Sequence, residues 1–216
     1  IGTGNLEIPH GAMLHCVASY KNDAQHQYWL ADLRNLPNAR RVLLEESDKE
    51  FKVLRDYLFN EVKPRKTARD FEFGVGLLLW MLGFSIAQPG ATQRTTDSVD
   101  LIATSTKGNI LLVECTVGLL KSDSKLSTLI ARAESTKRRM QNGHRHLIIQ
   151  PMIVTAMSRE DIKAELKDAI EHRVLVLTKE NLDQMFLQTL AAIDPDQFLE
   201  QLINAQFPTE NFNHGN

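Results

Sequence analysis

The sequence predicts an α/β fold in which helices cover both faces of a central sheet. The main observation is an alternation of apolar patterns after residue 66: a helix, three strands, and then helix, strand, helix, strand and helix. The second observation is size, because 216 residues, 43% of them hydrophobic, are enough for one good-sized core. Strands that alternate with helices are typical of crossover connections, which place helices on both sides of a sheet.

Periodicity and breakers delimit the elements of this region. Residues 67–82 are strongly apolar with helical spacing, with Thr67 expected as the N-cap. Gly83 suits the left-handed residue that often ends a helix. The remaining elements are expected as strands at 84–87, 98–103, 110–116, 147–154 and 173–177, and as helices at 124–141, 158–171 and 179–191.

The beginning of the chain is expected to form a small α+β appendage. Residues 12–19 and 26–32 have the composition of two strands around a polar turn, and residues 47–60 carry apolar side chains at helical spacing. The sequence thus predicts an N-terminal appendage of unassigned role at 1–62, a main domain at 66–205 and a flexible tail at 206–216.

Composition excludes several classes of protein. No run of about 18 apolar residues occurs, so no membrane span is expected. The two cysteines, Cys16 and Cys115, are far apart, which argues against a disulfide framework or a CxxC zinc site and for a cytoplasmic location. A formal net charge of -2 argues neither for nor against binding of nucleic acid, so any nucleic-acid-binding surface has to be a local basic patch. The start at Ile1, without an initiator Met, suggests a piece of a longer protein; a homodimer is left open.

Three acidic residues stand among apolar neighbours. Glu72 lies near the start of the first apolar helix. Asp100 and Glu114 lie in the second and third of the three strands expected after it. Taken singly, such a carboxylate is more often at a strand end, in water or paired with an Arg, because an unpaired charge is costly in apolar surroundings. Together, carboxylates on neighbouring strands are a natural way to hold a hard divalent cation. Such a cation can generate hydroxide and polarise a phosphoryl oxygen.

The order of these acids resembles that of the PD-(D/E)XK nuclease superfamily and, within it, the restriction-endonuclease-like, Mrr-type proteins. The matching features are the helix with its early Glu72, Asp100 before Leu101-Ile102-Ala103, the strand Leu111-Leu112-Val113-Glu114-Cys115, and the later Ile153-Val154-Thr155. They cover residues 69 to about 178. The resemblance implies a restriction-endonuclease-like core, a central mixed sheet flanked by helices, and hydrolysis of DNA phosphodiesters with Mg²⁺ or Mn²⁺.

The resemblance also implies roles for individual residues. In that family the positions of Asp100 and Glu114 bind the metal, together with the backbone carbonyl of the next residue, here Cys115. Glu72 matches a helix glutamate that often completes the site. DNA is the implied partner, with RNA a weaker option, and defence against foreign DNA is the implied role.

One position departs from the family pattern. The family usually has Lys two residues after the Glu, and this chain has Thr116, on the same strand face as Glu114. Thr can donate a hydrogen bond but carries no charge. In one interpretation another residue supplies the positive charge of the missing lysine, with Lys125 the best candidate and Lys121 the next. In the other, the site is degenerate and the fold acts as a nucleic-acid-binding or assembly module.

The helix expected at 124–141 is locally basic. Lys125, Arg132 and Arg139 are spaced by seven and share one face, whereas apolar residues such as Leu129 occupy the other. With Lys121, these cations are expected to bind a phosphate backbone without sequence choice. The alternative is an ordinary solvated face whose cations complement the helix dipole.

Overall fold

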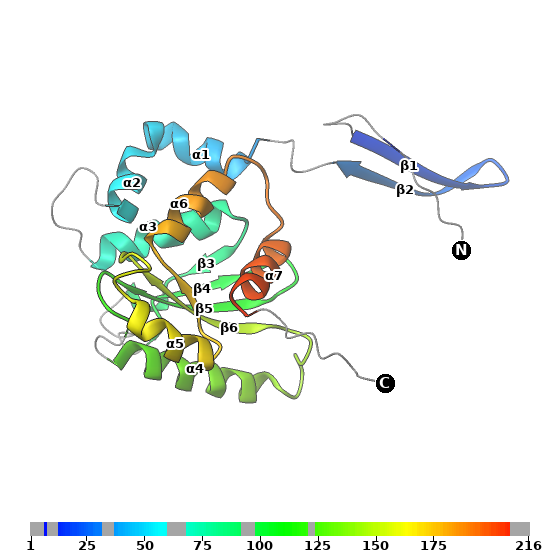
Figure 1. The fold of residues 1–216 in the computed structure, drawn as a ribbon. Helices are drawn as coiled ribbons and strands as arrows, with labels where there is room; N and C mark the ends of the chain where they lie inside the picture. Colours follow the sequence, from blue (N-terminus) through cyan, green and yellow to red (C-terminus); the bar gives the residue numbers. More distant parts are fainter. Residues whose placement is uncertain are drawn as a thin grey trace, which may run out of the picture.

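The computed structural model describes residues 7, 13–31, 37–59, 68–91, 98–120 and 124–207. These residues form an α/β core around a five-stranded sheet and a separate two-stranded hairpin (Figure 1). The α/β class and the central mixed sheet flanked by helices, both expected from the sequence, are confirmed.

The large sheet is mixed, with its longest strands at the centre. Its strands are β3 (Ser85–Ala87), β4 (Leu101–Thr104), β5 (Ile110–Thr116), β6 (Ile149–Thr155) and β7 (Leu175–Leu177), in that spatial order. β3, β4 and β5 pair antiparallel, whereas β5 and β6, and β6 and β7, pair parallel. β5 is therefore the central strand and the point at which the sheet changes from antiparallel to parallel pairing.

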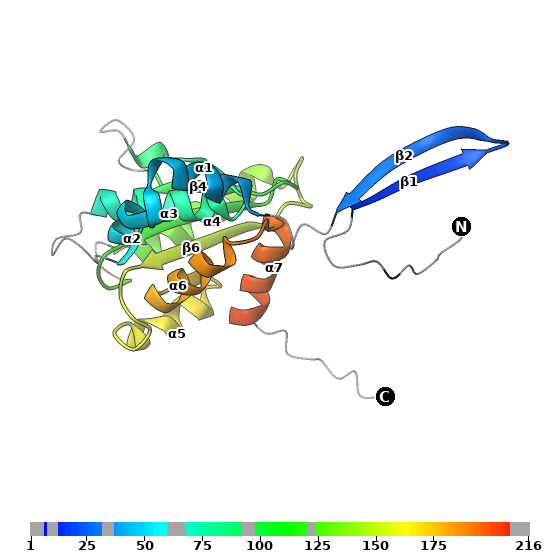
Figure 2. The same ribbon diagram turned by 90° about the horizontal axis from the view of Figure 1, so that it is seen from above.

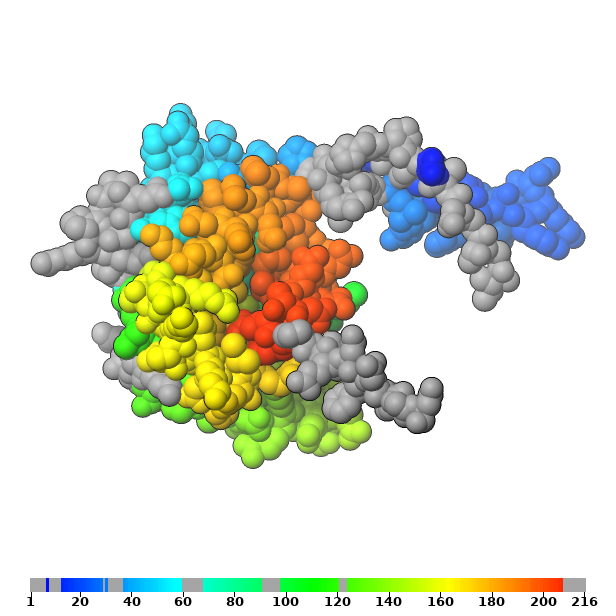
Figure 3. All heavy atoms as spheres, in the orientation of Figure 1, coloured from blue at the N-terminus to red at the C-terminus, as the bar shows by residue number. Residues whose placement is uncertain are grey.

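Helices cover both faces of the sheet, and each face has its own buried core (Figures 1 and 2). On one face lie α4 (Lys125–Met140) and α5 (Lys163–Glu171). On the other face lie α1 (Ala39–Ser47), α2 (Lys52–Phe59), α3 (Ala68–Met81), α6 (Lys179–Gln188) and α7 (Pro195–Gln206). Figure 3 shows α5, α6 and α7 next to one another on the surface, in yellow, orange and red.

α1 was not expected from the sequence. None of its residues is fully buried, so its apolar periodicity is weak. Asn38 is its N-cap: the side-chain oxygen accepts from the backbone N–H groups of Arg40 and Arg41. The helix expected at 47–60 begins only at Lys52, because Glu50 takes a left-handed φ of 59° in the short 3-10 turn between α1 and α2.

α7 was also missed, although its start is marked in the sequence. Asp194 caps it by accepting from the backbone N–H of Asp196, and Pro195 occupies the first helical turn, where Pro is favoured. Several other boundaries differ by a few residues, two of them near the acids and after β6. The helix expected at 158–171 begins at Lys163, and the strand expected at 98–103 begins at Leu101.

Residues 39–59, expected to belong to the appendage at 1–62, pack into the same core as α3. Phe51, Leu54 and Leu58 are buried in one cluster with side chains of α3, α6 and α7. α2 approaches α3 so closely that a Cβ added at Gly74 would lie 2.9 Å from the Cβ of Tyr57. This part of the chain therefore contributes to the main domain's core.

The hairpin consists of β1 (Met13–Tyr20) and β2 (Asp23–Ala31), paired antiparallel as the two strands expected from the sequence. Its turn uses Lys21 and Asn22 at φ 48° and 66°. Its apolar side chains are largely exposed, for example Met13 at 66% and Val17 at 51%. No described hairpin residue belongs to either buried core.

Several expectations lie outside the described residues: the cap at Thr67, the role of Lys121, and the tail beyond residue 207. Within the ranges that are described, no helix has the length and apolar character needed to cross a bilayer.

Asp196 in α7 anchors the turn between β4 and β5. Its buried carboxylate accepts from the Ser105 hydroxyl, from the Asn109 amide at 2.7 Å and from the Lys107 backbone N–H at 3.0 Å. Burial alone would raise the pKa of Asp196, but these hydrogen bonds outweigh it and hold the pKa below its ordinary value. Because β4 follows Asp100 and β5 carries Glu114, α7 stabilises the strand pair that positions both acids.

Replacing Asp196 by Ala should lower the free energy of unfolding by about 3 kcal/mol near neutral pH, because several buried donors lose their acceptor. The folded-state pKa is depressed, so the stabilisation is present above the ordinary value of 3.8 and is lost as the pH falls through the folded-state pKa. Urea unfolding at several pH values measures both effects. Asp183→Ala, at an exposed position of α6, is the matched control and should change stability by less than about 0.5 kcal/mol. Equal losses for the two variants would contradict the anchoring role.

Candidate functional site

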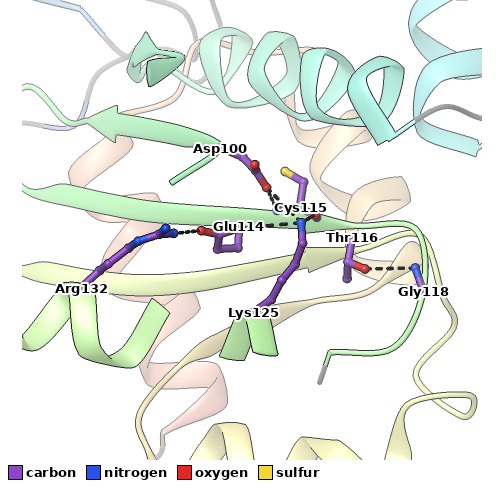
Figure 4. A network of polar contacts seen from close by, with 7 residues as sticks. All are labelled: Asp100, Glu114, Cys115, Thr116, Gly118, Lys125 and Arg132. Carbon is purple, nitrogen blue, oxygen red and sulfur yellow. Dashed lines mark hydrogen bonds and ion pairs between the residues drawn. The ribbon is translucent and has the colours of Figure 1, made fainter. Parts of the chain in front are cut away.

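Asp100 lies in a bend directly before β4. The β4–β5 pairing begins with Leu101 opposite Val113, so the Asp100 backbone lies just outside the ladder. There the Asp100 side chain takes over, since its Oδ2 accepts from the backbone N–H of Cys115 at 2.7 Å (Figure 4). The carboxylate thus replaces a backbone acceptor, so the strand begins later than expected and the acid is fixed beside β5.

Glu114 lies on the central strand with its side chain toward α4. Along β5, Val113 and Cys115 point into the core beneath α3, whereas Leu112 points into the core beneath α4. Strand alternation places Glu114 on the side of Leu112. The residue is only 5% exposed. A carboxylate buried to this degree requires charged or hydrogen-bonding partners.

Lys125, the first residue of α4, provides one of these partners. Its Nζ donates to the carbonyl oxygen of Cys115 at 2.6 Å and lies 3.5 Å from Asp100 Oδ2 and 3.8 Å from Glu114 Oε2 (Figure 4). The ammonium therefore has three oxygens around it, from β5 and from the bend before β4. The structure brings Lys125 to the two acids, where sequence reasoning expected the replacement for the missing lysine.

Arg132 provides the second partner. Its Nη1 lies 2.6 Å from Glu114 Oε1, in the geometry of a charge-assisted hydrogen bond. Sequence analysis assigned Arg132 to a phosphate-binding surface; in the structure, a phosphate would have to compete with Glu114 for this guanidinium. The spacing of seven from Lys125, beside a buried glutamate, was the signal that could have revealed the pair. Arg139, a further seven residues along α4, is exposed.

Thr116 and Cys115 point to opposite faces of β5. Thr116 lies on the Glu114 face by strand alternation and is 7% exposed. Its hydroxyl oxygen accepts from the backbone N–H of Gly118 at 3.1 Å, so it closes the turn after β5. The Cys115 side chain is buried in the opposite core, and burial raises the pKa of its thiol well above the ordinary value. Cys115 therefore meets the site through its backbone alone: its N–H donates to Asp100 and its carbonyl accepts from Lys125.

Glu72, on α3, is electrostatically linked to the site. Burial raises the pKa of Glu72, the charge of Asp100 raises it further, and Lys125 acts in the opposite direction. However, no three Asp, Glu, His or Cys side chains within the described ranges are grouped closely enough to hold a metal. Glu72 is therefore near the two acids without forming a third ligand in this arrangement.

Two opposing effects set the ionisation of Glu114. Burial and the neighbouring charge of Asp100 raise the pKa of Glu114, Lys125 and Arg132 lower it, and the net result is a rise from 4.5 to about 7. The short contact with Arg132 is that of an ionised carboxylate, so the cations keep the charged form accessible at neutral pH. Glu114 consequently titrates near neutrality rather than at its ordinary value.

The atoms around the Lys125 ammonium suit a hard divalent cation. Two carboxylate oxygens and one carbonyl oxygen surround a point that already holds a positive charge. Mg²⁺ and Mn²⁺ take oxygen ligands, and Mg²⁺ commonly uses one or two carboxylates and keeps several waters. The residues present therefore fit the expected ion, with the ammonium standing in for it.

No protein-family model matches this chain, and no match was found among curated proteins.

Replacing Glu114 by Gln should change how stability depends on pH. Because the folded-state pKa of about 7 lies above the ordinary 4.5, the stabilisation from this group is full below 4.5 and is lost as the pH rises through 7. The parent should therefore lose about 3 kcal/mol of stability relative to the variant across this range. Urea unfolding near pH 4.5 and pH 8 measures the difference. The matched control is Glu134→Gln on the exposed side of α4, which should follow the parent at both pH values. A Glu114→Gln difference that does not vary with pH would contradict the raised pKa.

Proposed function

We propose that this chain is a metal-dependent nuclease with a restriction-endonuclease-like core of the PD-(D/E)XK kind, hydrolysing DNA phosphodiesters with Mg²⁺ or Mn²⁺. The observation that carries the proposal is the cluster of Asp100, the Cys115 carbonyl and Glu114 around one cationic group. The order of elements agrees with it, since β4 and β5 present the acids and α4 returns over the same sheet face to β6. A role in defence against foreign DNA is part of the proposal and rests on the resemblance alone.

Each residue has a distinct part in the proposed reaction. Asp100, Glu114 and the Cys115 carbonyl would hold the ion, and Glu72 would accept a hydrogen bond from a water beside it. A bound Mg²⁺ or Mn²⁺ activates a water and polarises a phosphoryl oxygen. The Lys125 ammonium, on a flexible stem, would stabilise the negative charge that builds on the scissile phosphate. Thr116 would take no direct part, because its hydroxyl is held by Gly118.

The exposed C-terminal half of α4 offers a surface for the DNA backbone. Lys137, Arg138 and Arg139 occupy its last turns, and Arg139 is the residue of the expected basic face that stays exposed. A surface hollow of about 480 Å³ adjoins them, lined in part by Lys137, His144 and Arg145. A phosphate backbone bound here would extend along α4 from the acids, with salt-dependent and sequence-independent affinity.

A second candidate function is a catalytically degenerate nuclease fold that only binds nucleic acid or assembles with other proteins. One arrangement favours it: both acids already have cationic partners, and no third acidic ligand is grouped with them in the described part of the chain. The two candidates differ in whether metal ions convert binding into cleavage.

Cleavage should require both acids and a divalent ion. The purified chain, incubated with plasmid or single-stranded DNA, should cut with Mn²⁺ or Mg²⁺ and be inactive with chelator. Asp100→Asn and Glu114→Gln should each lower the rate by at least about 100-fold, since each removes a charged ligand. Asn is preferred to Ala at position 100, because its amide oxygen can still accept from the Cys115 N–H. The control Glu134→Gln should cut at the parental rate. Parental rates in both acid variants would place any activity elsewhere.

Lys125→Met keeps the apolar stem and removes the ammonium. We expect the cleavage rate at saturating metal to fall by about 100-fold or more, the typical loss of a charge-stabilising group. DNA affinity should change little, because one phosphate contact alters the salt slope by only about one. Thr116→Lys should partly rescue this variant, since it restores the usual lysine on the Glu114 face.

Two outcomes would decide against the proposal. Cleavage by Lys125→Met at the parental rate would remove the relocated lysine from the reaction. A parent that is inactive with every metal, alongside an active Thr116→Lys variant, would favour the degenerate fold.

A further inference from the structure

The surroundings of Lys125 differ from those of an ordinary surface lysine. Its closest contact is not an ion pair but a hydrogen bond of 2.6 Å to a backbone carbonyl, that of Cys115. The two carboxylates lie farther away, at 3.5 Å and 3.8 Å, on other sides of the same nitrogen. These three oxygens are the ones that a divalent ion would use, so ion and ammonium cannot occupy the point together.

We propose that the Lys125 ammonium occupies the divalent-cation position of the metal-free protein, and that a divalent ion binds only by displacing it. The proposal rests on the proposed metal site and adds a competitor that belongs to the chain itself. Lys125 therefore has two successive positions: at the Cys115 carbonyl without metal, and outside the ligand set with metal.

Charge balance requires this displacement. Near pH 8, above the pKa of Glu114, Asp100 and Glu114 carry two negative charges, and Lys125 and Arg132 neutralise both. A divalent ion added to that set would leave a net charge of about two in a half-buried site, where like charges repel strongly. Departure of one cation relieves the repulsion. Lys125 is the cation that lies among the three ligand oxygens, so it is the one that the ion would displace.

Of the two cations, only Lys125 is placed to leave. The two side chains are similarly exposed, at 25% for Lys125 and 27% for Arg132, so exposure does not separate them. The ion pairs of Lys125, at 3.5 Å and 3.8 Å, are longer than that of Arg132, and a lysine has four flexible methylene groups and a single compact donor head. Arg132 is held at 2.6 Å by Glu114 Oε1 in a charge-assisted hydrogen bond. Arg132 is thus a positioning residue that keeps Glu114 oriented while Lys125 moves.

Binding of Ca²⁺ tests this displacement without reference to cleavage. Isothermal titration of the parent, Lys125→Met and Arg132→Met near pH 8 compares two variants that each lose one positive charge beside Glu114. We expect Lys125→Met to bind Ca²⁺ at least about tenfold more tightly than the parent, and at least severalfold more tightly than Arg132→Met. An unchanged or weaker affinity in Lys125→Met, or equal gains in both variants, would overturn the proposal; equal gains would show an effect of net charge alone.

A measurement on the parent covers the case in which a variant does not fold. Lysine side-chain NMR of the parent during a Ca²⁺ titration should show the Lys125 signal shift in step with binding. A Lys125 signal that stays fixed while Ca²⁺ binds would overturn the displacement. The nuclease proposal is judged separately, since a chain that exchanges Lys125 for Ca²⁺ and cuts no DNA with Mn²⁺ would keep this inference and lose that function.

Discussion

A carboxylate on the central strand of a sheet stays ionised only if a cation is built in beside it, and Glu114 imposes this requirement on its surroundings. The chain meets this requirement with α4, because Lys125 and Arg132 on this helix both reach Glu114 on β5. The same helix buries Leu126, Leu129 and Ala133 against the sheet. One helix therefore supplies both the apolar cover of this sheet face and the charges that make a buried glutamate tolerable.

Asp100 shows how a single side chain links the ladder to the site. By accepting from the Cys115 N–H, it satisfies a backbone donor that β4 leaves unpaired, and this hydrogen bond fixes the carboxylate beside β5. The turn beyond β4 is fixed from the opposite side by Asp196 of α7. The positions of the two acids thus depend on hydrogen bonds that are distinct from any ion they would bind.

The sequence predicted the sheet and most of its helices because their apolar residues recur at clear periods. It did not predict α1, whose residues stay partly exposed, or the late start of β4 after Asp100, where a side chain replaces a backbone acceptor. In the site, Lys125 was expected beside Asp100 and Glu114 as the relocated lysine, whereas Glu72, expected as a further ligand, is not grouped with the two acids within the described residues. The pairing of Arg132 with Glu114 was not, because spacing places a cation on a helix face but does not say whether that face meets solvent or a buried acid.

The hairpin β1–β2 has a consequence for the dynamics of the molecule. Among the hairpin side chains that the structure describes, almost none is buried, so opening the hairpin would expose little additional apolar surface from them. Its amide protons are therefore protected from hydrogen exchange by the two-stranded ladder alone, whereas those of β5 and β6 exchange only when a buried core is disrupted. The hairpin and the α/β core should accordingly differ strongly in their protection from hydrogen exchange, and the candidate site lies in the protected core.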